Sequence, residues 1–184
     1  MVMDKRNQMI AGASCAFEAE GFRGIGVDRV LASSGASTRT LYKHFGSRDG
    51  LVVAVLDARH RTFMERLEAE AEDADPAGSL FAALRRWLEE RGARGCMLLR
   101  ARSEYSAASE EIVTLVRRQK DEFRVEVSRR LELALGRVEE TLATQVWLLF
   151  EGAMAGASVS DLSVVDKAAQ AARSLIEGAR NRAS

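Results

Sequence analysis

The spacing of apolar residues along the chain predicts a protein built almost wholly of α-helices. In most segments apolar residues recur at positions i, i+3, i+4 and i+7, which is the spacing of one helix face. Period-two alternation, the mark of strands, is scarce, and a single proline leaves long stretches free to be helical. We expect about nine helices, over residues 4–20, 27–34, 37–45, 47–72, 76–91, from about 96, 109–135, 138–157 and from 163.

Glycines divide the first fifty residues into short helices. Gly21 ends the first predicted helix, Gly35 ends the second and Gly46 follows the third. Two short helices joined by a three- or four-residue turn that contains glycine are typical of a helix-turn-helix. The order G-x-x-G-x-G at 21–26 differs from the G-x-G-x-x-G of dinucleotide-binding loops, and no strand precedes it. We therefore expect no nucleotide cofactor.

The third predicted helix has the polarity of a DNA recognition helix. Placed at 100° per residue, Leu41 and Phe45 form its apolar edge. Arg39 and Lys43 lie on the opposite side, where an arginine suits the O6 and N7 edge of guanine. A solvated helix face is the alternative, but the N-cap Ser37 and the absence of acidic residues favour DNA binding. The candidate DNA-binding residues are Arg29, Ser37, Thr38, Arg39, Thr40, Tyr42, Lys43, His44 and Arg48.

These turns and the third helix resemble the DNA-binding half of TetR-type repressors, in the segments Gly21–Val27, Gly35–Ser37 and Thr40–Leu51. The family usually has Thr or Ser where Gly26 stands, so a helix cap and a phosphate contact are altered here. Lysine is usual at the position of Arg48, and arginine can keep the same phosphate contact. The resemblance implies that Tyr42 and His44 also contact DNA.

The resemblance implies two domains, a helix-turn-helix DNA-binding domain at 1–50 and a ligand-binding and dimerisation domain at 51–184. It implies a homodimer that binds a palindromic double-stranded DNA operator and leaves it when a small-molecule effector binds. Large aromatic residues on separate helices of the second domain could form only a hydrophobic core, or they could line an apolar pocket. The resemblance to the family favours the pocket. The candidate ligand-binding residues are His60, Met64, Trp87, Met97, Arg102, Phe123, Trp147 and Phe150.

Small side chains mark two stripes in the last two predicted helices. Such surfaces let helix axes approach closely, and we expect them to pair with their copies across a two-fold axis as a four-helix bundle. In the alternative, the two helices pack only on each other within one chain. The candidate dimer residues are Trp147, Gly152, Ala153, Gly156, Ala168, Ala172, Leu175 and Ile176.

The composition and charge of the chain argue against several other classes of protein. The net charge is zero, although the first fifty residues hold seven Lys and Arg against five Asp and Glu. Cys15 and Cys96 lie far apart and only two histidines occur, so we expect no zinc site, no disulfide framework and a reducing, cytoplasmic location. Apolar runs such as Val146–Phe150 are far too short to span a bilayer, so no membrane partner is expected. No catalytic motif supports an enzyme. A helical protein–protein adaptor would leave the basic face of the third helix without a role.

Overall fold

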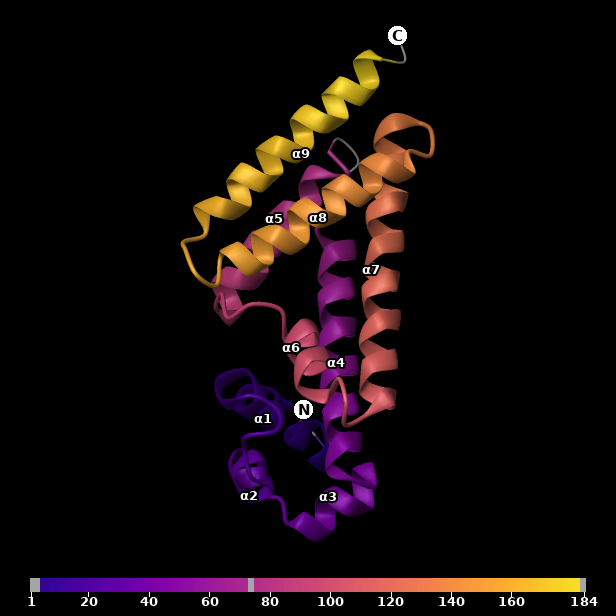
Figure 1. The fold of residues 1–184 in the computed structure, drawn as a ribbon. Helices are drawn as coiled ribbons and strands as arrows, with labels where there is room; N and C mark the ends of the chain where they lie inside the picture. Colours follow the sequence, from indigo (N-terminus) through magenta and orange to yellow (C-terminus); the bar gives the residue numbers. More distant parts are fainter. Residues whose placement is uncertain (1–3, 73–74, 183–184) are drawn as a thin grey trace. The chain divides into compact units, whose positions relative to one another are not determined.

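The computed structural model describes residues 4–72 and 75–182, and every regular element in these ranges is helical. The predicted all-α fold is confirmed. The elements are α1 (Lys5–Glu20), α2 (Val27–Leu31), the 3-10 turn η1 (Ala32–Ser34), α3 (Thr38–Phe45), α4 (Arg48–Ala69), α5 (Gly78–Arg91), α6 (Met97–Tyr105), α7 (Glu110–Leu135), α8 (Glu140–Gly156) and α9 (Ser163–Asn181), labelled in Figure 1.

The second helix is shorter than the predicted segment 27–34, because its last turn tightens into η1. The Ser34 hydroxyl donates a hydrogen bond to the Leu31 carbonyl at 2.9 Å, a local bond that competes with the α-helical pattern. Gly35 follows with φ of +59° and ends the turn. The chain can then reverse direction into α3, which completes a helix-turn-helix.

The described residues form two compact units. Unit 1 contains the chain up to Thr62 together with Met97–Arg118, and unit 2 contains Phe63–Cys96 and the chain from Gln119 onward. Unit 1 therefore includes α6 and the first turns of α7, whereas the predicted boundary at residue 50 assigned both to the second domain. The sequence order could not show this association, because the contacts that create it are long-range.

Unit 1 has its own apolar core. Buried residues from α1, α2, α3, α4, α6 and α7 form one cluster, and the loop between α1 and α2 adds two more apolar side chains. The fully buried members include Met9, Phe17, Phe22, Leu41, Leu51, Leu56, Ala101 and Ile112. Because α6 contributes to this cluster, the helix-turn-helix is packed against a helix that lies more than fifty residues further along the chain.

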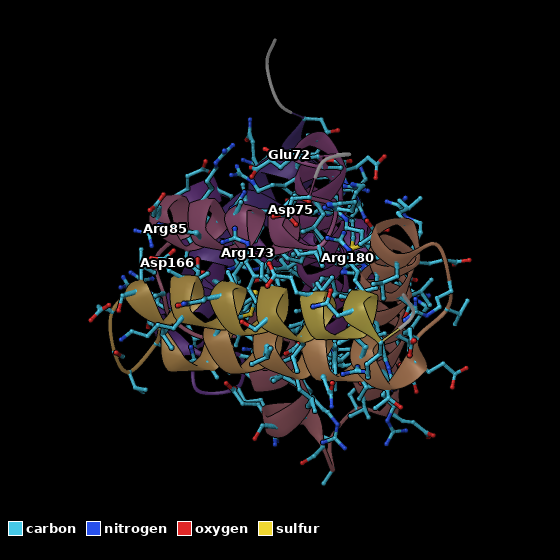
Figure 2. All side chains as sticks on the ribbon, turned by 90° about the horizontal axis from the view of Figure 1, so that it is seen from above. Glu72, Asp75, Arg85, Asp166, Arg173 and Arg180 are labelled. Atoms are coloured by element: carbon cyan, nitrogen blue, oxygen red, sulfur yellow. The ribbon has the colours of Figure 1, made fainter. Side chains whose placement is uncertain are left out.

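Unit 2 is held together by a second apolar core and by charged contacts between helices. Helices α8 and α9 lie side by side, and α9 also packs on α5 (Figure 1). Arg85 on α5 and Asp166 on α9 form an ion pair at 2.5 Å and lie next to each other in Figure 2. Arg180 donates to the Ala134 carbonyl at 3.0 Å, which satisfies a carbonyl in the last turn of α7.

A buried arginine links three helices of unit 2. Arg130 on α7 is only 1% exposed, and its guanidinium donates to Glu126 at 2.7 Å and to the Ser79 hydroxyl at 2.6 Å. It also donates to the carbonyl of Leu67 on α4. Burial raises the pKa of Glu126, but hydrogen bonds from Arg129 and Arg130 outweigh this and hold that pKa below its ordinary value. Glu126 therefore stays ionised as the partner of Arg130.

Candidate nucleic-acid interface

The third helix is bounded as its sequence predicts. The Ser37 hydroxyl accepts a hydrogen bond from the Thr40 amide at 3.2 Å, which caps the N-terminus of α3. Gly46 ends the helix with φ of +72°. Leu41 is buried in the core of unit 1 and Phe45 is half-buried against it, so these two residues fix which face of α3 points outward.

The outward face of α3 is polar and basic. Thr38, Arg39, Lys43 and His44 are exposed, and Tyr42 keeps 55% of its surface exposed. Thr40 is half-buried, with its hydroxyl bonded to that of Ser37 at 2.9 Å. Within the described chain, neither Arg39 nor Lys43 has a hydrogen-bonding or ionic partner. Their donors are therefore available to phosphates or base edges.

Two basic residues near this face were not predicted from the sequence. The guanidinium of Arg6 on α1 lies 5.3 Å from the centre of the Phe45 ring, beside the end of α3. The Lys5 ammonium donates to the Ser34 carbonyl at 2.6 Å and so holds the turn between the two helices. Periodicity within α1 gave no sign of either contact, because both partners lie at least 29 residues away.

Arg29 is exposed on α2, as expected, but its guanidinium already has an acidic partner. Its guanidinium forms an ion pair with Glu20 at 2.9 Å, and both side chains are exposed. Such an exposed pair contributes about 0–1 kcal/mol to stability and can rearrange when a phosphate approaches. Arg29 stays a prediction as a DNA contact.

Arg48 lies differently from the phosphate contact that the resemblance implies. Its guanidinium points into unit 1, where it donates to the carbonyls of Phe22 and Ile25, the latter at 2.9 Å. It also donates to the Tyr105 hydroxyl at 3.1 Å. Burial raises the pKa of Tyr105, so this phenol keeps its proton. These tertiary contacts, which no local pattern shows, occupy both terminal nitrogens of the guanidinium, and a phosphate contact of Arg48 stays a prediction.

The predicted ligand-binding residues are divided between the two units, and their common site stays a prediction. Met97 is buried in the core of unit 1, and Arg102 is exposed on α6 of that unit. His60 also belongs to unit 1, as part of α4. The remaining five residues belong to the core cluster of unit 2 or pack against it, and they are Met64, Trp87, Phe123, Trp147 and Phe150.

The aromatic residues of unit 2 pack against one another around Phe63, which the sequence did not single out. The Phe63 ring centre lies 5.2 Å from that of Trp87 and 5.8 Å from that of Phe123. Phe123 and Phe150 are 4.5 Å apart. These are contact distances between rings, so the rings form core as they stand.

Trp147 is the exception among these aromatic residues. It is half-buried on α8, and the guanidinium of Arg124 lies 5.6 Å from its ring centre. Its indole Nε1 is buried and has no hydrogen-bond acceptor among the described residues. A buried N–H without an acceptor costs about 1–3 kcal/mol, so this position favours an additional acceptor.

A cavity of about 500 Å³ lies elsewhere, within unit 1. Its lining comes from α4 and the start of α7, and it contains none of the predicted ligand-binding residues. Arg118 and Asp57 form an ion pair across it at 3.5 Å. The other lining residues are Val53, Glu110, Glu111, Thr114 and Leu115.

Half of the predicted dimer residues are buried within the single chain. Ala153, Ala168, Ala172 and Ile176 belong to the core of unit 2, where α8 and α9 cover each other's small side chains. Gly156 is also an internal contact, because a Cβ atom there would lie 3.2 Å from Val164. Exposed positions remain at Gly152 and Leu175, and Trp147 is partly exposed.

Comparison with known proteins agrees with this geometry. Residues 9–55 match the family model described as bacterial regulatory proteins of the tetR family. The fold is similar to that of a TetR-family transcriptional regulator from Streptomyces coelicolor, with a TM-score of 0.87 and 24% identity over 96% of each chain. It is also similar to a TetR transcription regulator from Haloarcula marismortui, with a TM-score of 0.81 and 17% identity over 95% of this chain and 97% of that one. No curated protein sequence matches the chain.

Two further findings concern other kinds of partner. Among residues 4–72 and 75–182, no three His, Cys, Asp or Glu side chains are grouped so that they could hold a metal ion. In the same ranges, none of the helices combines the length and the apolar character that crossing a bilayer requires.

Proposed function

We propose that the chain is a ligand-responsive repressor. The premise is that it is a TetR-type regulator, which is supported by the match of residues 9–55 and by the fold. It binds a palindromic double-stranded DNA operator as a homodimer in the cytoplasm and leaves the operator when a small apolar or aromatic molecule binds. TetR-type regulators are not enzymes, and DNA binding through the helix-turn-helix is their common activity.

The exposed basic face of α3 is the observation that carries the DNA-binding proposal. A recognition helix must enter the major groove with free donors, and Arg39 and Lys43 meet this requirement. In a dimer, two α3 helices would contact successive major grooves about one helical turn apart, so the operator should be roughly palindromic. Tyr42 at the flank of α3 is suited to a phosphate, which positions the protein without reading sequence.

Arg39→Ala should weaken binding to the operator by about 1–3 kcal/mol and relax the preference at one base position. The test duplex is the DNA flanking the gene, or a site that the wild-type protein selects from a random pool, and binding is measured by gel shift. Arg86→Ala, which removes an exposed arginine from α5, is the matched control and should bind normally. An unchanged affinity and base preference in Arg39→Ala would remove Arg39 from base reading, and a wild-type protein that binds no DNA would favour an adaptor.

For the dimer, we propose the exposed rather than the buried small residues of α8 and α9. Leu148, Gly152 and Ala155 follow each other at helical spacing on α8, and Leu148 is 55% exposed. Ala171 and Leu175 form a similar exposed pair on α9, one turn apart. Small exposed residues beside an exposed leucine allow a second helix to approach closely, as an isologous four-helix contact requires.

For the effector, we propose a site in unit 2 beside Trp147. Trp147 packs against the apolar core of unit 2 on one side and has the Arg124 guanidinium near its ring, and the unpaired indole N–H favours a ligand that carries a hydrogen-bond acceptor. The effector must bind the DNA-free arrangement more tightly than the DNA-bound one. A tenfold preference shifts that equilibrium by about 1.4 kcal/mol.

Trp147→Phe should raise the effector concentration needed for release from DNA about fivefold, because the ring is kept and one hydrogen bond of about 1 kcal/mol is lost. The probe is the aromatic carbonyl compound that most raises the melting temperature of the wild-type protein in a thermal-shift screen. Leu133→Ala changes an exposed apolar residue of α7 and should respond like wild type. Normal release from DNA in Trp147→Phe would exclude the indole N–H from the site.

A further inference from the structure

Glu104, at the end of α6, binds the loop that leads into the helix-turn-helix. Its carboxylate oxygen Oε2 accepts hydrogen bonds from two consecutive backbone amides, Phe22 at 2.9 Å and Arg23 at 2.8 Å. Its other oxygen, Oε1, accepts from the Arg100 guanidinium at 3.2 Å. Hydrogen bonds to a charged acceptor are about twice as strong as neutral ones, so this is a firm attachment.

Arg48, at the start of α4, binds the same loop from its carbonyl side. It donates to the carbonyls of Phe22 and Ile25, and its guanidinium also bonds the Tyr105 hydroxyl. The segment 22–25 is thus held by a carboxylate on its N–H groups and by a guanidinium on its C=O groups. We call Glu104 and Arg48 together the loop clamp.

The approach of α6 to this loop depends on a glycine. Gly21 has φ of +85°, a conformation that side chains with a Cβ rarely adopt. A Cβ atom at this position would lie 2.9 Å from Arg100 Nη2 and 3.0 Å from Glu104 Oε1. The glycine therefore permits both the turn and the close contact with α6.

Helix α2, the first helix of the helix-turn-helix, depends on tertiary contacts to fix its N-terminal end. Helix α2 has only five residues, and its N-cap is Gly26, which offers no side chain to accept the first amides. A helix of this length is not stable alone, so tertiary contacts must fix where it begins. Phe22 and Ile25 are buried in the core of unit 1, and the loop clamp fixes the backbone between them.

We infer that Glu104 is a positioning residue for DNA binding: with Arg48 it fixes the entry of α2, and so the helix-turn-helix, although it lies outside the family-matched segment 9–55. This inference rests on the proposed DNA-binding function. It assigns Arg48 to the loop rather than to a phosphate. It also means that the working DNA-binding unit includes α6, because the carboxylate that holds the loop comes from there.

The test uses the full chain and the duplex that the wild-type protein selects from a random-sequence pool. Glu104→Ala should weaken binding to this duplex about tenfold, because two loop amides lose their charged acceptor. Glu104→Gln keeps an acceptor oxygen and should restore binding to within about threefold of wild type. Ser103→Ala, at the exposed neighbouring position of α6, is the control and should bind normally.

Two further measurements separate positioning from general loss of structure. Hydrogen exchange at the Phe22 and Arg23 amides should accelerate in Glu104→Ala and be largely protected again in Glu104→Gln. Both tryptophans, Trp87 and Trp147, belong to unit 2, and their fluorescence should show the unfolding of that unit unchanged. Wild-type binding together with wild-type exchange in Glu104→Ala would overturn the inference. If the wild-type protein selects no duplex, the proposed function fails, and exchange at the two amides still decides whether the clamp exists.

Discussion

Arg130→Met should lower the free energy of unfolding of unit 2 by about 3–5 kcal/mol. Methionine has nearly the length of the arginine stem but no donor, so Glu126, whose side chain is 13% exposed, loses its buried partner and keeps only the exposed Arg129. The Ser79 hydroxyl and the Leu67 carbonyl lose the guanidinium as well. Urea unfolding followed by the fluorescence of Trp87 and Trp147 measures the change in the unit concerned.

Two variants test whether the buried charge is the cause. Arg129→Met removes the other arginine that binds Glu126, but that side chain is 47% exposed, so the expected loss is below about 1 kcal/mol. The double variant Arg130→Met and Glu126→Leu also removes the partly buried carboxylate that has lost Arg130, and it should recover part of the loss. Equal losses in Arg129→Met and Arg130→Met would show that burial of Arg130 does not set the cost.

Gly152→Glu should convert the proposed dimer to monomer at micromolar concentration. A stable dimer of this kind buries on the order of 2,000 Å² in total, and a charge placed in its dry centre costs several kcal/mol. The single chain should accept the substitution, because no atom lies within 4 Å of the place where a Cβ would be added. Sedimentation velocity measures the oligomeric state, and circular dichroism checks that the helices are retained.

The choice of Gly152 follows from the packing of α8. Gly156→Glu would drive a side chain into Val164 of the same chain, so loss of the dimer there could not be distinguished from damage to the fold. Val125→Glu places the same charge on an exposed position of α7 and should stay dimeric. A dimer that persists in Gly152→Glu would exclude this face of α8, and a monomeric wild-type protein would exclude the proposed two-fold mechanism.

Local physical rules were enough to predict α3 and its ends from the sequence. The cap at Ser37 and the end at Gly46 follow from interactions within a few residues, and the helical period predicts that Leu41 faces the core. Exposure of Arg39 and Lys43 follows from the helical period once Leu41 is known to face the core. The helix-turn-helix and the all-α fold were predictable for the same reason.

The same rules could not decide which partner covers an apolar or small-residue stripe. The sequence showed such stripes on α8 and α9 and left open whether a second chain or the same chain covers them. The tertiary structure buries Ala153, Ala168 and Ala172 within one chain and leaves Gly152 exposed. Helical periodicity predicts that a face is buried, but the burial partner is a long-range property of the packing.

The sequence by itself therefore determined the helices, the helix-turn-helix and the outward face of α3, because each depends on neighbours along the chain. Only the tertiary structure decided the roles of Arg48, Glu104 and Arg130, because each side chain bonds to backbone or side chains far away in sequence. Arg48 shows the difference most clearly. Its position in the motif suggested a phosphate contact, and its contacts in the folded chain direct it to the loop between α1 and α2.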